Sequence, residues 1–164
     1  MAKIDRVYWD SDCFLGYLKG ERDKIGICRG TADKAQKGDL IIITSAITLI
    51  EVVRLQKQPV QLSAKDAKKI TQFFQNPYIY VHTVDSAVST IARQLIWDHN
   101  LQQRDSIHVA TALLRTIPKL HTFDERLLKL DGKLGNPKLR ICKPDIQGQM
   151  DLGALYDEKD GQST

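Results

Sequence analysis

The segment at residues 40–44, LIIIT, constrains the fold of this chain more than any other. It is aliphatic and β-branched along its whole length, and strands of that kind belong to parallel sheets that are covered on both faces. Further short apolar segments read as strands, and helical patterns separate them. This alternation predicts an α/β fold, a three-layer sandwich in which a central, mostly parallel sheet is flanked by helices. The expected strands are residues 4–10, 40–44, 77–84, 119–123 and 138–142.

Helices are expected where apolar residues recur at helical spacing between those strands. Ser45 and Ser63 stand where they would cap the helices that follow them, and Gly38 ends the helix before it. In sheets of this kind, ligands bind beyond the carboxyl ends of the strands, at the point where the strand order reverses. Functional side chains are therefore expected at that edge. The expected helices are residues 11–20, 31–38, 46–56, 64–75, 85–100, 105–115 and 124–130.

The length of 164 residues suits one domain, and a hydrophobic fraction of 42% is enough for its core. We expect that domain to span residues 1–143 and the polar end, residues 144–164, to be a loosely ordered extension. The three cysteines are far apart and form no zinc-type spacing with the histidines, which predicts free thiols and a reducing compartment. No apolar run approaches the roughly 20 residues of a membrane span. A cytoplasmic protein without membrane contact is the expectation.

The chain is mildly basic, with a net charge of +4 and an isoelectric point of about 8.9. Residues 104–143 carry nine Lys or Arg against four acidic residues. This balance fits a nucleic-acid partner, although solvated helix faces give the same pattern. The sequence contains no glycine-rich phosphate loop and no internal repeat, so neither a nucleotide-binding loop nor a repeat array is indicated.

Three acidic residues stand where chain segments leave strands or enter helices. Asp10 follows the first expected strand, Asp124 follows the fourth, and Asp105 begins a helix with an apolar face. Each also has a structural explanation, because an Asp at a helix N-terminus caps the helix or interacts favourably with its dipole. Taken singly, these residues leave capping and function open.

Glu51 has the weakest structural explanation among the acidic residues. It is expected well inside the helix over residues 46–56, six positions beyond Ser45 and among aliphatic neighbours. A carboxylate in that setting is partly desolvated, which is costly without a cation. An ion pair with Arg54, or exposure between two apolar stripes, would satisfy it, and a bound metal ion is the alternative.

Carboxylates that converge at one edge repel one another, and hard divalent cations relieve that repulsion. Asp10, Glu51, Asp105 and Asp124 offer only oxygen donors, which suit Mg²⁺ or Mn²⁺. Such an ion activates a bound water and stabilises charge on a phosphoryl group. The sequence therefore predicts metal-assisted phosphodiester hydrolysis, with the basic segment attracting the polyanion.

Four strings of the sequence resemble the successive motifs of PIN domains, in order and over residues 4 to about 130: VYWDSDCFLGYL, ITLIEVVRL, RDSIHVATALL and HTFDERLLKL. The resemblance implies a five-stranded parallel sheet and a catalytic site of Asp10, Glu51, Asp105 and Asp124 that holds one or two Mg²⁺ or Mn²⁺ ions. Stand-alone members of this size are similar to VapC-type toxins, which cleave RNA, are silenced by a small antitoxin protein and commonly form homodimers. The implied function is a metal-dependent endoribonuclease, as the toxin of a toxin–antitoxin pair.

Three residues near these motifs are expected to assist. Ser11 and Thr122 carry hydroxyls that would orient a water or a phosphate. Asp12 stands where the family more often has a small polar residue such as Asn or Ser. A solvent-facing role in the first helical turn fits Asp12 better than a water-mediated metal contact.

Other polar side chains are expected around the acids. Arg93 and Arg104 are candidate contacts for RNA phosphates, with plain surface solvation as the alternative. His108 follows Asp105 by three positions and shares its helix face. It is expected to be a hydrogen-bonded structural residue, because the site is built from oxygen ligands.

Two other functions remain open. The pair Asp10 and Asp12 at a strand end, with Thr/Ser after the next strand, resembles a haloacid-dehalogenase-type phosphatase in which Asp10 is the nucleophile and Asp12 the acid/base. That alternative leaves Glu51 unexplained and lacks the paired acids that it expects at a later strand end. The second alternative is a PIN-like module that binds nucleic acid without cutting it. It predicts that Asp10→Asn leaves function unchanged.

Overall fold

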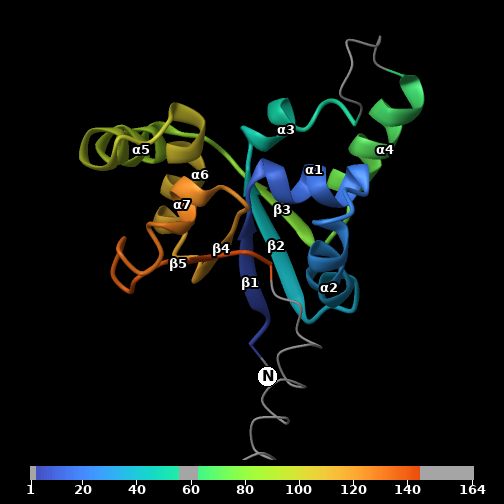
Figure 1. Cartoon of the computed structure of the whole chain (residues 1–164), viewed down its shortest axis with the longest axis horizontal. Coiled ribbons are helices and arrows are strands. Elements are labelled where there is room, and N and C mark those ends of the chain that lie inside the picture. Colours follow the sequence, from blue (N-terminus) through green and yellow to red (C-terminus); the bar gives the residue numbers. More distant parts are fainter. Residues whose placement is uncertain (1–2, 56–62, 145–164) are drawn as a thin grey trace, which may run out of the picture.

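The computed structural model describes residues 3–55 and 63–144, which form a five-stranded sheet between two layers of helices (Figure 1). The strands are β1 (Asp5–Trp9), β2 (Leu40–Ser45), β3 (Ile79–His82), β4 (Lys119–His121) and β5 (Arg140–Cys142). Neighbouring strands are parallel throughout, in the order β3-β2-β1-β4-β5. The predicted three-layer α/β sandwich is confirmed. The predicted extension, residues 144–164, lies outside the described residues except for its first residue.

The strand order places β1 at the centre of the sheet. The chain adds β2 and β3 on one side of β1, and later β4 and β5 on the other. The order therefore reverses beside β1, and ligands of open parallel sheets bind at the carboxyl ends of the strands that flank such a point. Because Trp9 of β1 pairs with His121 of β4, the residues that follow these two strands emerge next to each other.

In the described part of the chain, seven helices pack around this sheet: α1 (Ser11–Lys19), α2 (Ile25–Gln36), α3 (Thr48–Glu51), α4 (Ala64–Phe74), α5 (Ser86–His99), α6 (Gln103–Leu114) and α7 (Glu125–Leu128). Helices α1, α2 and α4 cover one face, and α5, α6 and α7 cover the other (Figure 1). Side chains of β1 alternate between the two cores, Val7 and Trp9 under the first layer and Tyr8 under the second. This burial on both faces explains why the strands are apolar throughout.

The helix predicted over residues 46–56 was wrong in length. It is a single four-residue turn, α3, because the backbone of Val52 leaves the helical region (φ −95°, ψ 76°) and the side chain inserts into the core at 1% exposure. Ser45, predicted to cap this helix, is the last residue of β2, and its hydroxyl accepts a hydrogen bond from the backbone N–H of Ile47 at 3.4 Å. Ile47 itself holds the N-cap position of α3, without a side-chain capping bond. Glu51 therefore ends a helix instead of lying within one.

The helix predicted from residue 31 begins earlier, at Ile25. Gly26 and Gly30 lower the helix propensity of this stretch, but Cys28 between them is fully buried in the core, and that packing outweighs local propensity. The other predicted helices and strands match the structure to within a few residues. Over residues 3–55 and 63–144, no helix is long and apolar enough to cross a membrane.

Candidate active site

The four predicted acidic residues lie beyond the carboxyl ends of the strands, where the strand order reverses. Asp10 directly follows β1, and Asp124 comes three residues after β4. Glu51 ends α3, which follows β2, and Asp105 lies in the first turn of α6. The negative charges of Asp124 and Glu51 both act on Asp105, so the structure brings these groups within electrostatic reach of one another.

Asp10 is the most buried of the four, at 5% exposure. Its Oδ1 accepts a hydrogen bond from the backbone N–H of Cys13 at 3.2 Å, so it does cap α1. Its Oδ2 accepts from the hydroxyl of Thr122 at 2.5 Å. Burial raises the pKa of Asp10 from 3.8 to about 6, and electrostatic attraction to His108 and the Thr122 hydrogen bond oppose this only in part. The carboxyl that caps α1 is therefore also one whose charged form is disfavoured by burial.

Thr122 links the two strand ends. Its hydroxyl donates to Asp10 and accepts from the backbone N–H of Asp124 at 3.1 Å. Asp124 in turn caps α7, accepting from the backbone N–H of Arg126 at 2.9 Å, and its other oxygen lies 3.5 Å from the Arg126 guanidinium. The Thr122 hydroxyl, predicted to orient a water or a phosphate, bonds to two of the acidic residues and holds them in position.

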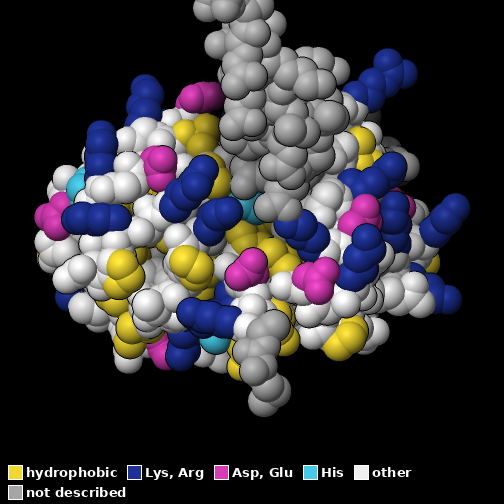
Figure 2. All heavy atoms as spheres, turned by 90° about the horizontal axis from the view of Figure 1, so that it is seen from below, with side chains coloured by type: hydrophobic (Ala, Val, Ile, Leu, Met, Phe, Trp, Pro, Cys, Tyr) yellow, Lys and Arg dark blue, Asp and Glu magenta, His cyan; other side chains and the backbone are white. Residues whose placement is uncertain are grey.

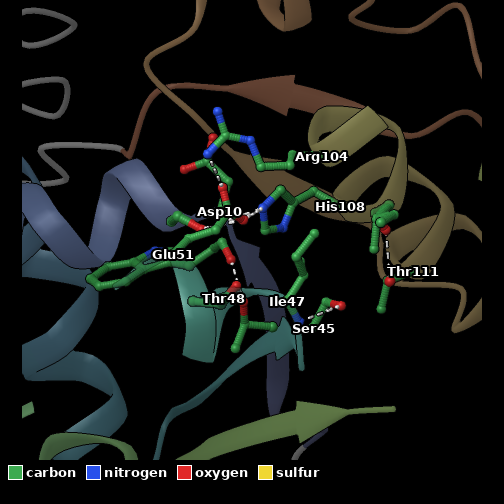
Figure 3. A network of polar contacts seen from close by, with 12 residues as sticks. Asp10, Ser45, Ile47, Thr48, Glu51, Arg104, His108 and Thr111 are labelled. Carbon is green, nitrogen blue, oxygen red and sulfur yellow. Dashed lines mark hydrogen bonds and ion pairs between the residues drawn. The ribbon is translucent and has the colours of Figure 1, made fainter. Parts of the chain in front are cut away.

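Glu51 is held by side chains from two other helices (Figure 3). Its Oε1 accepts from the hydroxyl of Ser11 and from Nε2 of His108, both at 2.8 Å. Its Oε2 lies 3.6 Å from Nη1 of Arg104, so its arginine partner is not Arg54, the neighbour considered from the sequence. Burial by itself would raise the pKa of Glu51, but these donors and charges outweigh it and hold the pKa below its usual value of 4.5.

His108 connects Glu51 to the core of the protein. Because the carboxylate of Glu51 accepts, Nε2 of His108 carries a proton, and in the neutral ring Nδ1 then accepts from the hydroxyl of Tyr8 at 2.6 Å. His108 is hydrogen-bonded and 2% exposed, as expected for a structural histidine, but its partner is a candidate site residue. Tyr8 was missed by sequence reasoning. Its one signal is that a tyrosine hydroxyl in a buried strand needs a partner.

Asp105 differs from Glu51 in having no close partner. Its side chain forms no ion pair or hydrogen bond with another described residue, and it is partly buried. Burial raises the pKa of Asp105, and the negative charge of Asp124 raises it further. A cation bound nearby would stabilise the charged form of the Asp105 carboxyl.

The four carboxylates fall into two pairs, which differ in whether a positive side chain already lies beside them. Glu51 and Asp124 face arginine side chains, whereas Asp10 and Asp105 carry raised pKa values. Among the described residues, no three or more His, Cys, Asp or Glu side chains are arranged to hold a metal ion as they stand. The donor set nevertheless suits a hard divalent cation, because all four groups offer oxygen and two of them hold poorly compensated charge.

The remaining predicted residues separate by position. Ser11 donates to Glu51, and Asp12 is exposed in the first turn of α1. Arg104 contacts Glu51, while Arg93 lies on α5 with its guanidinium 5.1 Å from the centre of the Trp97 ring. The structure thus brings Arg104 to the acids and leaves Arg93 with an aromatic neighbour on an exposed helix face.

Comparison with known proteins identifies one family whose profile matches this chain. The PIN domain family profile matches residues 7–133, which is most of the chain. A comparison with curated protein sequences gives no match.

Two solved structures share the fold. One is a chain of a toxin–antitoxin complex from Klebsiella pneumoniae, with 17% identity and a TM-score of 0.57 over 85% of this chain and 98% of that chain. The other is Mycobacterium tuberculosis VapC20, described as a sarcin–ricin loop cleaving toxin, with 14% identity and a TM-score of 0.58 over 73% of this chain and 90% of that chain. With a family profile that spans β1 to α7 and the same arrangement of strands and helices, this chain belongs to the PIN-domain family.

Proposed function

We propose that this protein is a metal-dependent endoribonuclease that hydrolyses phosphodiester bonds of RNA. The observation that carries the proposal is the set of acidic residues at the reversal point of a PIN-domain sheet, with the pKa of Asp10 and of Asp105 raised by burial. Perturbed carboxyls gathered at the ligand-binding edge of an α/β sheet are typical of a functional site.

Likeness to the two solved proteins supports the choice of RNA and of a toxin role. VapC20 is described as cleaving the sarcin–ricin loop, and the Klebsiella protein as part of a toxin–antitoxin complex. We extend both features to this chain: RNA as substrate, and a protein antitoxin as partner. A homodimer in the cytoplasm remains part of the same proposal.

In this proposal Asp10, Glu51, Asp105 and Asp124 hold the metal. A bound Mg²⁺ or Mn²⁺ ion would supply an activated water and stabilise negative charge on the phosphoryl group. The arginines beside Glu51 and Asp124 are exposed, and ion pairs so exposed are weak enough to exchange for another cation.

The residues around the acids keep them in place. Ser11 and His108 fix one oxygen of Glu51, and Thr122 fixes one oxygen of Asp10. Supporting hydrogen bonds of this kind set the direction of a functional carboxylate and are a common feature of metal sites. Arg104, with 70% of its side chain exposed beside Glu51, is placed to bind a phosphate of the RNA.

Positive charge by itself does not mark the path of the RNA. Figure 2 views the molecule from the side of the amino-terminal ends of the strands, opposite the acids. Lys and Arg side chains are spread over the described part of that face, with Asp and Glu between them. The RNA is therefore assigned to the carboxyl edge by the acidic residues and by Arg104, and not by net charge.

The alternative of a phosphatase with Asp10 as nucleophile has less support. The family match covers residues 7–133, which include all four acids, and the proposed metal site gives Glu51 a role that a phosphatase would not. Asp12, which would be the acid/base of that reaction, is an exposed residue of the first turn of α1.

The test is cleavage of an RNA pool with Mg²⁺ or Mn²⁺, against the same pool with EDTA and against a DNA pool of matched sequence. We expect the wild-type protein to cut RNA only with metal, and Asp105→Asn to cut it at least about 100-fold more slowly. Asp33→Asn, an exposed residue of α2, is the matched control and should behave as wild type. Equal cleavage by wild type and Asp105→Asn would defeat the proposal. Rapid release of phosphate from a generic aryl phosphate, with RNA left intact, would favour the phosphatase.

A further inference from the structure

We propose that a pocket beside Asp105 binds the RNA nucleotide next to the phosphodiester that is cut. This inference rests on the ribonuclease function proposed above. The pocket has a volume of about 340 Å³ and lies between the end of α5 with the α5–α6 connection, residues 99–102, and α7 with the residues that directly follow it. That volume falls within the range of small-ligand sites. Asp105 forms part of its wall, so the pocket borders the candidate active site.

The walls of the pocket carry the chemistry that recognises a nucleotide. Arg126 and Lys129 bring positive charge to one side, which suits a phosphate. Asn100 and Gln102 bring side-chain amides, each with donors and an acceptor for the edge of a base. The ring of His99 completes the surface as a partner for stacking.

These side chains are available to a ligand. Within the described residues, the side chains of His99, Asn100, Gln102 and Lys129 form no hydrogen bond or ion pair with the rest of the protein. They are also exposed, and the pocket floor between them includes the buried Leu101. Unpaired donors over an apolar floor are the usual composition of a ligand site.

Arg126 couples the pocket to the acidic residues. Its guanidinium lies 3.5 Å from Asp124, but its side chain is 60% exposed, and an ion pair so exposed contributes little. A phosphate in the pocket offers Arg126 a stronger, charge-assisted partner. Binding of RNA would then free the Asp124 carboxylate, which the proposed function assigns to the metal.

An RNA strand fits the pocket better than a free nucleotide does. The carboxylate of Asp105 in the wall repels an isolated anion, whereas a strand is held by contacts on both sides of the pocket. Arg104 is placed to make one of those contacts, since it lies one residue from Asp105 and beside Glu51. The nucleotide in the pocket would thus lead the backbone to the acids.

The binding test uses the full chain and a fluorescently labelled, single-stranded RNA decamer of mixed sequence, in EDTA so that metal-dependent cleavage is absent. We expect Lys129→Ala to raise Kd by about 3- to 10-fold and to lower the slope of log K against log salt by roughly 0.7, the effect of one lost phosphate contact. Lys68→Ala, an exposed lysine of α4 on the opposite layer, is the control and should match wild type. Unchanged urea midpoints confirm that each variant is folded.

A second measurement addresses the base. Mapping the cut ends in an RNA pool with Mn²⁺ should show that Gln102→Ala changes the base preference beside the cut, while Lys68→Ala does not. If wild type cuts RNA but both Lys129→Ala and Gln102→Ala behave as Lys68→Ala in Kd and in cut position, the pocket is not the subsite. If adenosine monophosphate binds wild type more tightly than Lys129→Ala and the RNA decamer does not bind, the ligand is a free nucleotide and the inference is overturned. If the Lys129 effect on RNA binding is present but no RNA is cut under any condition, the ribonuclease proposal fails while the binding site stands.

Discussion

Asp10→Asn should make the metal-free protein more stable at neutral pH while removing its activity. The pKa of Asp10 is raised by burial from 3.8 to about 6, so folding disfavours the charged carboxylate. The gap between those two values corresponds to about 3 kcal/mol of free energy of unfolding, at roughly 1.4 kcal/mol for each pH unit. Asn carries no charge and therefore escapes this penalty.

The sign of the effect sets a pH window. Below about pH 3.8 the carboxyl is protonated in both the folded and the unfolded chain, and the penalty is absent. It grows as the pH rises towards about 6 and is fully present above that value. The side chain of Asn can still accept from the backbone N–H of Cys13 and can donate to Thr122, so the cap of α1 is retained.

The assay is urea unfolding of wild type and Asp10→Asn in EDTA at pH 4 and pH 8. We expect the variant to be more stable by up to about 3 kcal/mol at pH 8 and by well under 1 kcal/mol at pH 4. The melting temperature at pH 8 should rise by roughly 6–12 °C for a chain of this size. Asp33→Asn is the control and should show no such pH-dependent difference. A variant that is less stable than wild type at pH 8, or whose gain is the same at both pH values, would refute the reasoning.

Three further predictions concern the supports of the site and the fold. Tyr8→Phe removes the hydroxyl that donates to His108 at 2.6 Å. Urea unfolding should show a free energy of unfolding lower by about 1 kcal/mol, and steady-state kinetics should show a lower kcat with little change in KM. A lower KM with unchanged kcat would argue against a positioning role. Glu51→Gln should lose stability near pH 7, because the pKa of Glu51 is lowered in the fold and its carboxylate therefore stabilises the folded state above its usual value of 4.5. This loss should shrink as the pH falls below 4.5 and through the lowered pKa; urea midpoints across that range are the measurement, and a loss independent of pH would contradict the prediction. Gly135→Ala should lower the free energy of unfolding by about 1–3 kcal/mol in thermal melts, because the backbone has φ +82° and an added Cβ would lie 2.7 Å from the Leu113 side chain. An unchanged melting temperature would show that the turn adjusts without cost.

The sequence was sufficient for features that depend on near neighbours. The run at residues 40–44 indicated a strand buried on both faces, and it is the second strand of a fully parallel sheet. Asp10 and Asp124 were recognised as residues at strand-to-helix junctions, and each caps the helix that follows. These features follow from backbone preferences and hydrophobic spacing, which act over a few residues and can therefore be predicted from the sequence.

The tertiary structure alone decided what surrounds the acids. Glu51 was expected inside a long helix, but core packing of Val52 ends that helix and turns the carboxylate towards Ser11 and His108, which lie 40 and 57 positions away in the chain. Thr122 reaches Asp10 because β4 pairs with β1, a pairing that no local pattern specifies. The pocket beside Asp105 likewise joins segments that are distant in sequence. Such contacts depend on the order in which strands join the sheet, and that order is set by the burial of the whole chain and not by the residues that end up in contact.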